Sequence, residues 1–165
     1  MKNTSHCVIR KIELQEINIL EEMLYQAIFL PEGEVLPRDV IYRPEIYVYI
    51  KDWGKEDDLC LVAEIDHKIV GAVWTRILDG KIKGYGNIDS ETPEFAISLL
   101  EEYRNLGIGT RLMNEMIEQL KRRGYKKTSL SVAKENYALK LYQNVGFEVI
   151  DENEEDYLML LVLNE

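Results

Sequence analysis

Several residue types that many sites require are scarce in this chain. It has two cysteines and two histidines among 165 residues, and no Cys-x-x-Cys pair occurs. The scarcity argues against a disulfide framework and a clustered zinc site, so we expect no metal and a reducing, cytoplasmic compartment. No apolar run approaches the length of a membrane span, and residues 1–6 lack the apolar core of a signal peptide.

Positive charge is also in short supply. Twenty Lys and Arg residues face 30 Asp and Glu residues, which gives a formal net charge of −10 and a pI of about 4.8. Such a surface repels nucleic acid and anionic membranes, so we expect neither as a partner. The length and the 46% apolar content predict one globular domain over residues 1–165.

Two common phosphate loops are missing. No Gly-x-x-x-x-Gly-Lys-Ser/Thr run exists, and a Gly-x-Gly-x-x-Gly loop fails because Leu112 stands at the third glycine position. The chain has instead Arg104-x-x-Gly107-x-Gly109, between the apolar run 95–100 and a helical pattern. The free N–H groups and partial positive charge of a helix start suit a phosphate or pyrophosphate. The alternative is a glycine turn that only caps the helix.

Hydrophobic periodicity predicts a mixed α/β sheet with helices. The expected strands are 8–12, 59–65, 69–77, 94–100, 128–132, 147–150 and 157–163, and the expected helices are 16–29, 108–123 and 136–145. Residues 46–50 fit either a short helix or an extended segment, and residues 80–87 fit either a loop or an irregular hairpin. Gly124 and Gly146 stand where helix C-terminal caps belong.

A second motif, Asn136…Leu141-Tyr142…Gly146-Phe147, follows the expected strand 128–132. Asn136 would lie at a helix entrance as a candidate N-cap, and the Tyr142 phenol can donate a proton to a leaving group. The alternative for Tyr142 is a packing tyrosine. Without a supporting motif, that alternative would be favoured.

The two motifs in this order, Tyr103-Arg104-x-x-Gly107-Ile108-Gly109 and then Asn136…Phe147, resemble the GNAT superfamily of N-acetyltransferases. The matching region is about 94–147. The resemblance implies an α/β fold whose central mixed, mostly antiparallel sheet is flanked by helices. A V-shaped splay between two central strands would admit acetyl-coenzyme A.

The resemblance also implies roles for particular residues. The cofactor contacts would be Leu99, Leu100, Arg104, Asn105, Leu106, Gly107, Ile108, Gly109, Thr110, Asn136 and Tyr142. Tyr142 would also be the catalytic acid that protonates the departing thiolate. Two residues depart from the common pattern: Glu101 replaces a frequent proline and Asn105 a frequent glycine. Asparagine tolerates left-handed backbone angles better than most residues, so the turn remains feasible.

The family usually transfers acetyl directly to an amine in a ternary complex. The acceptor would be a primary amine of a small molecule, peptide or protein. The base candidates are Glu94 and Glu91, and Glu94 is preferred because it interrupts an otherwise apolar strand; a solvated surface acid is its alternative. Since members often dimerise, the resemblance also allows a homodimer.

Two other functions fit the same motifs. One is a non-catalytic acyl-coenzyme A sensor of the same fold, and the other is a domain whose glycine turn holds a different nucleotide. Acceptor specificity would lie in residues 26–53 and 79–92. Acidic residues there would attract a cationic amine: Glu32, Glu34, Asp39, Glu45, Asp89 and Glu91.

Overall fold

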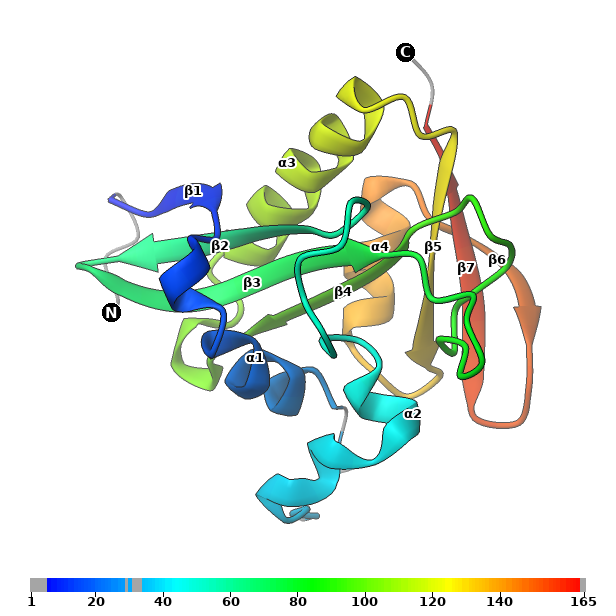
Figure 1. Cartoon of the computed structure of the whole chain (residues 1–165), viewed down its shortest axis with the longest axis horizontal. Coiled ribbons are helices and arrows are strands. Elements are labelled where there is room, and N and C mark those ends of the chain that lie inside the picture. Colours follow the sequence, from blue (N-terminus) through cyan, green and yellow to red (C-terminus); the bar gives the residue numbers. More distant parts are fainter. Residues whose placement is uncertain (1–5, 29, 31–33, 164–165) are drawn as a thin grey trace.

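The computed structural model describes residues 6–28, 30 and 34–163. Within them, a seven-stranded sheet has the order β1-β2-β3-β4-β5-β7-β6, and helices flank it (Figure 1). The elements are β1 Val8–Lys11, η1 Leu14–Glu16, α1 Ile19–Ala27, η2 Arg38–Tyr42, α2 Pro44–Tyr47, β2 Leu59–Ile65, β3 Lys68–Arg76, β4 Glu94–Leu99, η3 Glu101–Tyr103, α3 Ile108–Arg122, β5 Lys127–Ala133, α4 Ala138–Val145, β6 Glu148–Glu152 and β7 Asp156–Val162. All neighbours are antiparallel except β4 and β5, which are parallel. The predicted mixed, mostly antiparallel sheet is therefore confirmed.

The sheet is covered on both faces, and alternating residues of β3 show this. Val73 belongs to the core cluster that α3 completes with Leu112 and Met116. The next residue, Trp74, belongs to the other cluster, which α1 completes with Leu20. Successive strand side chains point to opposite faces, so burial on both sides explains the continuous apolar runs of these strands.

The hairpin of β2 and β3 turns at Asp66 and His67. Both residues have positive φ, 52° and 65°. A two-residue hairpin loop with positive φ at both positions matches the right-handed twist of the strands. The predicted hairpin is confirmed, although β3 already begins at Lys68.

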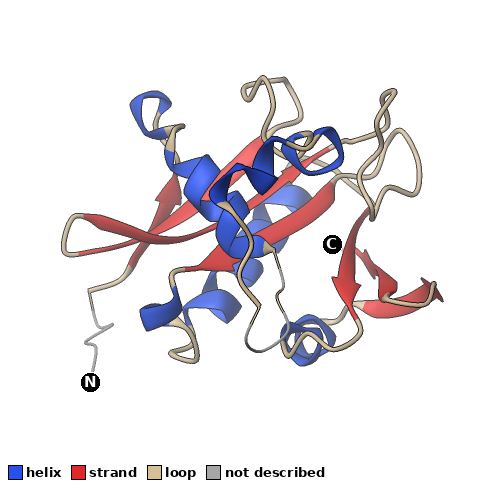
Figure 2. Cartoon of the chain, turned by 90° about the horizontal axis from the view of Figure 1, so that it is seen from below, coloured by secondary structure: helices blue, strands red, loops and turns tan. Residues whose placement is uncertain are grey.

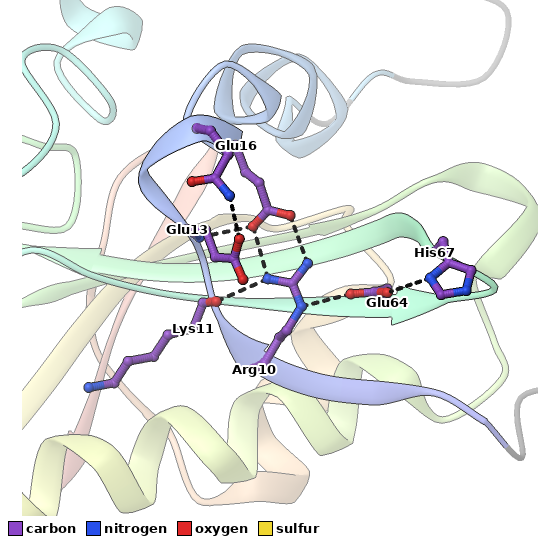
Figure 3. Close-up of polar contacts among 7 residues, drawn as sticks. Arg10, Lys11, Glu13, Glu16, Glu64 and His67 are labelled. Carbon is purple, nitrogen blue, oxygen red and sulfur yellow. Dashed lines mark hydrogen bonds and ion pairs between the residues drawn. The ribbon is translucent and has the colours of Figure 1, made fainter.

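The first helix is shorter than the predicted range 16–29. Glu16 ends the separate 3-10 turn η1, where its carboxylate accepts hydrogen bonds from the Glu13 N–H at 2.9 Å and from both Arg10 Nη atoms at 2.9 and 2.7 Å (Figure 3). The bonds from Arg10 lower the pKa of Glu16 to about 2. At the other end, Ile28 turns to extended backbone with ψ 117°. Phe29, the last predicted helical residue, lies outside the described residues.

The two segments that the sequence left open are now assigned. The range 46–50 begins in the short helix α2, which starts at Pro44, and continues as a turn. Residues 80–87 form a loop, closed in part by a bond from the Gly84 N–H to the Leu78 carbonyl at 3.1 Å. None of the helices in the described part of the chain is long and apolar enough to cross a membrane.

The strands β4 and β5 separate along their length, as the predicted V-shaped splay requires. Their parallel pairing is confined to one register pair, Glu94 with Ser129. The other edge of β4 pairs with β3 throughout, from Gly71 opposite Leu99 to Arg76 opposite Glu94. In Figure 2 the β5, β7 and β6 strands accordingly stand apart from the rest of the sheet.

Candidate active site

A cavity of about 580 Å³ opens where β4 and β5 diverge. Its walls come from the end of α1, the second half of β4, the turn before α3 and the start of α4. Of the residues predicted from the sequence to bind the cofactor, the cavity is lined by Leu99, Arg104, Asn105, Gly107, Gly109, Thr110, Asn136 and Tyr142. The fold thus brings the two sequence motifs to one cleft.

The β4 edge in this cleft has backbone groups without a strand partner. The Leu100 N–H donates to the Val70 carbonyl of β3 at 2.8 Å. Because backbone groups of successive strand residues point to opposite edges, those of Leu99 and Ile97 point toward β5. With β5 absent at this point, they face the cleft. The Leu99 carbonyl already accepts a hydrogen bond from Arg104 Nε, whereas the Leu99 N–H and the Ile97 groups can bind the amide groups of a ligand lying along β4.

The turn between β4 and α3 presents the N–H groups of a helix start. Asn105 and Gly107 both adopt left-handed angles, with φ 63° and 86°. Gly107 occupies the N-cap position, where no side chain caps α3, and the first turn of the helix carries no acidic residue. The first intrahelical bond runs from the Arg111 N–H to the Gly107 carbonyl, so the N–H groups of residues 108–110 have no helical partner.

These features fit a pyrophosphate. A Cβ atom added to Gly107 would have nothing within 4 Å, so the backbone there is open to an approaching group. Unsatisfied N–H donors and the positive end of the helix dipole both favour an anion. Arg104 adds a positive charge that has no carboxylate partner within the part of the chain described. Its Nε donates to the Leu99 carbonyl at 3.1 Å and its Nη2 to Gln26 Oε1 at 3.2 Å.

Asn136 connects the cleft to α4. The helix begins at Ala138, two residues after the predicted start, and Tyr137 takes the N-cap position predicted for Asn136. The Asn136 side chain still acts at the helix entrance, because its Oδ1 accepts a hydrogen bond from the Ala138 N–H at 2.8 Å. The amide nitrogen of Asn136 has no hydrogen-bond partner among the described residues, so it can donate to a ligand in the cleft.

Tyr142, the acid predicted from the second motif, lines the cleft. Its side chain is buried, at 9% exposure, and its ring meets Phe147 edge-on with centroids 6.2 Å apart. Burial raises the pKa of the Tyr142 phenol well above its ordinary value, so the hydroxyl stays protonated at neutral pH. The protonated hydroxyl can therefore donate a proton or a hydrogen bond.

Three residues of the predicted cofactor set do not line the cleft. Both backbone groups of Leu100 are occupied, because its N–H donates to Val70 and its carbonyl accepts from Tyr103 at 2.9 Å. That Leu100 offers backbone groups to the cofactor stays a prediction, and in this structure both groups have partners within the chain. The side chain of Ile108 is 1% exposed within the core, and Leu106 packs against the same cluster. Ile108 contributes its N–H at most.

Glu94 lies at the other end of β4, outside the lining of the cleft. It is 2% exposed, and its Oε2 accepts hydrogen bonds from the Tyr49 hydroxyl and from the Gly86 N–H at 3.0 Å. Oε1 has no partner among the described residues. Burial raises the pKa of Glu94 to about 7, against the lowering effect of the two hydrogen bonds. Such a carboxyl group takes up and releases a proton near neutral pH.

Glu91, the other base candidate, is exposed on the loop, where its N–H donates to Asp89 Oδ1 at 2.8 Å. Glu91 therefore lacks the burial that raises the pKa of Glu94. Of the two predicted bases, Glu94 has the environment of a general base. Glu32, one of the acids assigned to acceptor binding, lies outside the described residues.

Sequence reasoning missed two contributors to the site. Gln26 lines the cleft and holds Arg104, and no local motif marks it. Tyr49 binds Glu94 from 45 positions away, and no local motif marks it either. The glycines of the loop 80–87 were visible in the sequence, and they are the signal that this loop packs closely against something.

A second hollow of about 540 Å³ lies beside β1 and the β2–β3 hairpin. Arg10 crosses it and binds Glu16 and Glu64, each at 2.7 Å (Figure 3). The charges of Arg10, Glu16 and Glu64 therefore compensate one another. Among the residues that the structure describes, no three His, Cys, Asp or Glu side chains gather in a way that would hold a metal ion.

Residues 22–147, most of the chain, match the model of the acetyltransferase (GNAT) family. The chain therefore belongs to the GNAT family of acetyltransferases.

Two curated relatives illustrate the range of the match. A probable N-acetyltransferase camello of Xenopus laevis is 35% identical over 94 residues, which are 56% of this chain and 40% of that protein. An N-alpha-acetyltransferase of Sulfurisphaera tokodaii is 28% identical over 124 residues, 68% of this chain and 74% of that protein. The chain spans about two fifths of the length of the Xenopus relatives.

Solved structures share the fold. The PaiA N-acetyltransferase from Thermoplasma acidophilum, in complex with coenzyme A, has a TM-score of 0.69 at 20% identity, covering 94% of this chain and 98% of that one. A putative acetyltransferase from Salmonella typhimurium with its cofactor acetyl-CoA has a TM-score of 0.68 at 16% identity, covering 98% and 96%. At these identities the likeness shows the fold alone.

Proposed function

We propose that the chain transfers an acetyl group from acetyl-coenzyme A to a primary amine. The observation that carries this proposal is the convergence of three features in one cleft. The uncapped start of α3 offers donors for a pyrophosphate, the free edge of β4 offers backbone groups for an amide-bearing arm, and Tyr142 offers a protonated hydroxyl. A pyrophosphate, amides and a thiolate leaving group occur together in an acyl-coenzyme A.

Each residue has a distinct part in this proposal. The N–H groups of residues 108–110, with Arg104, bind the pyrophosphate. Leu99 orients the pantetheine arm through its backbone, and Asn136 donates its side-chain amide. Acetyl-coenzyme A, when bound, supplies an acetyl thioester that an amine can attack directly. Tyr142 gives its hydroxyl proton to the departing sulfur.

Glu94 is the proposed general base. An amine attacks only when it is neutral, so its proton must leave before or during transfer. Glu94 lies at the end of β4 opposite the pyrophosphate turn, and its carboxyl group titrates near neutral pH. A carboxylate at this end of the strand receives the proton on the side of the sheet where α1 and α2 pack.

The proposed acceptor is a primary amine with positive charge in its free form. Glu34 and Glu101 line the cleft, and the surface carries a net negative charge. The Sulfurisphaera relative is named an N-alpha-acetyltransferase, and a further relative in Haemophilus influenzae is named a [ribosomal protein bS18]-alanine N-acetyltransferase. Peptide N-termini are therefore the first acceptors to test, with polyamines beside them.

Calorimetric titration with acetyl-coenzyme A, and with ATP as the control, tests cofactor binding. Release of free thiol is then followed after addition of amines. We expect acetyl-coenzyme A to bind more tightly than ATP and thiol to appear with at least one amine. Binding without turnover on any amine would instead favour a sensor, and tighter binding of ATP would favour a nucleotide domain.

A further inference from the structure

Glu94 lies beneath a loop that has no room for a side chain at Gly84 or Gly86. A Cβ atom on Gly84 would overlap Oε1 of Glu94 and lie 2.8 Å from Leu78 Cδ1. A Cβ atom on Gly86 would lie 2.8 Å from the backbone of Leu130 on β5. Glycine at both positions therefore lets the loop close directly onto the carboxylate.

The same loop is fastened at the point where β4 and β5 still pair. The Gly86 N–H donates to Glu94 Oε2 at 3.0 Å, and the Gly86 carbonyl accepts from the Ser129 hydroxyl at 2.7 Å. Ser129 is the β5 residue in register with Glu94. The loop thus lies where β4 and β5 begin to separate. Its Gly86 N–H is one of the two hydrogen-bond donors to the Glu94 carboxylate.

The second donor is the Tyr49 hydroxyl, which joins the carboxylate to the loop. The hydroxyl donates to Glu94 Oε2 and accepts a hydrogen bond from the Tyr85 N–H at 2.9 Å. Burial, and then the nearby Glu94 carboxylate, raise the pKa of Tyr49 well above its ordinary value. Tyr49 therefore remains a donor throughout the neutral range.

The backbone around Tyr49 is held by two side chains of β3. Trp74 Nε1 donates to the Tyr49 carbonyl at 3.1 Å. Arg76 Nη1 donates to the carbonyls of Val48 at 3.0 Å and Lys51 at 2.8 Å. These bonds fix the chain on both sides of Tyr49, so the phenol has little freedom to leave the carboxylate.

Arg76 does not neutralise Glu94, although the two residues are opposite each other in register. Its guanidinium is committed to Asp58, through Nε at 3.0 Å and Nη2 at 2.7 Å. The groups that face the Glu94 carboxylate are therefore the Tyr49 hydroxyl and the Gly86 N–H. Within the described part of the chain no cation contacts Glu94, so these two donors are what favours its charged form.

We infer that Tyr49 is a positioning residue for Glu94: its hydroxyl, locked to the closed loop through Tyr85, holds the carboxylate ready to accept the proton of the acceptor amine. The inference rests on the proposed function, in which Glu94 is the base. It assigns Tyr49 an indirect part, because the proton goes to Glu94 and the phenol keeps its own.

The test is Tyr49→Phe in the full chain, with the pH dependence of kcat/KM for acetyl transfer as the readout. Loss of one hydrogen bond to the charged carboxylate disfavours the ionisation of Glu94. The acidic limb of the pH profile of kcat/KM should therefore move to higher pH by about one unit. The plateau at high pH should stay within about threefold of the wild type, because the proton acceptor is still present. Tyr125→Phe is the matched control, since Tyr125 also donates to a carboxylate, Asp57, away from the cleft lining.

A readout independent of activity separates this inference from the proposed function. Carbon NMR of protein labelled at the glutamate carboxyl carbons gives the titration curve of Glu94. Its signal is assigned as the one that is missing from the spectrum of E94Q. We expect the midpoint to rise in Tyr49→Phe and to be unchanged in Tyr125→Phe. If no amine is acetylated, the proposed function fails, yet this titration still tests the role of Tyr49.

Gly84→Ala is a second variant that leaves Tyr49 in place. Its Cβ must displace the loop or the carboxylate. The acidic limb of the pH profile and the NMR titration midpoint of Glu94 should therefore also move to higher pH. Gly80→Ala is the control, because a Cβ at Gly80 meets nothing within 4 Å. An unmoved midpoint in Tyr49→Phe would overturn the inference. A plateau lowered about 100-fold would overturn it too, because Tyr49 would then carry the proton itself.

Discussion

The two ends of β4 differ in almost every physical respect. At Leu99 the strand has lost its β5 neighbour, and its outer edge faces a cleft. At Glu94, roughly 16 Å away along the strand, β5 is still paired and a glycine loop closes over the carboxylate. The open end offers backbone groups beside a cleft that Glu34 and Glu101 also line, whereas the closed end offers one buried acid.

The comparison shows how a single strand can hold two different chemical environments. Where pairing ends, the backbone becomes a polar surface that binds a ligand without any particular side chain. Where pairing persists, the backbone is satisfied, and a desolvated side chain acquires a shifted pKa. The splay between β4 and β5 creates both environments.

Among variants at the two ends of β4, the largest effect is expected from replacing the acid at the closed end. The folded-state pKa of Glu94, about 7, lies above its ordinary value of 4.5. The folded state therefore binds this proton more tightly, and the stability so gained is complete below pH 4.5 and lost as pH rises through 7. Glu94→Gln cannot ionise, so at pH 8 it should be about 3 kcal/mol more stable than the wild type, with little difference at pH 4. Urea unfolding of both proteins at pH 4 and pH 8 measures this difference in the free energy of unfolding.

Asp58→Asn is the contrasting control for that prediction. Asp58 is also buried, but it holds Arg76 in a bidentate pair, with both side chains 3% exposed. Removing its charge leaves the guanidinium unpaired, which should destabilise the protein by about 3–5 kcal/mol at pH 8. If both amide variants lost stability at pH 8, the idea that the ionised Glu94 carboxylate destabilises the folded state would be wrong.

Tyr142→Phe should affect catalysis at the open end with little effect on binding. Loss of a general acid lowers rates by about 100-fold or more, whereas the ring still packs against Phe147. We expect kcat to fall by that factor while the Kd for coenzyme A, measured by calorimetry, changes less than about twofold. Tyr157→Phe, on β7 outside the cleft lining, serves as the control. An unchanged kcat in Tyr142→Phe would refute the acid assignment.

Gly107→Val tests the pyrophosphate turn. Its left-handed φ of 86° is unfavourable for a β-branched residue, and the new side chain would project into the cleft. Weakening one or two N–H contacts to an anion should raise the coenzyme A Kd roughly 10- to 100-fold. Gly124→Val is closely matched, since Gly124 lies at the other end of α3 with the same φ of 86° and the same empty surroundings. Equal loss of binding in both variants would mean that strain, and not the site, is responsible.

Gly109→Ala should have the smallest effect. A Cβ at Gly109 would make ordinary contacts, 3.4 Å from Leu141 and 3.6 Å from Leu99, and its φ is not left-handed. We expect the coenzyme A Kd to stay within about threefold of the wild type. A loss as large as that of Gly107→Val would show that the ligand approaches the Gly109 backbone directly, as a strict reading of the two-glycine motif requires.

Local backbone chemistry could be predicted from the sequence. The start of α3 after Gly107, the glycine at the end of α4 and the β2–β3 hairpin all follow from rules that span a few residues. The length of α1 could not be predicted in this way. Its start depends on Glu16 being held by Arg10 of β1, which no pattern within the helix reveals.

The sequence by itself determined the family, the glycine turn and the residues of both motifs, because these depend on short-range backbone geometry and fixed spacing. The tertiary structure decided what those residues face. It gave both backbone groups of Leu100 to neighbouring segments, turned Arg104 toward Gln26 and buried Glu94 against Tyr49. Desolvation and hydrogen bonding depend on neighbours that are distant in the chain, and only folding brings those neighbours together.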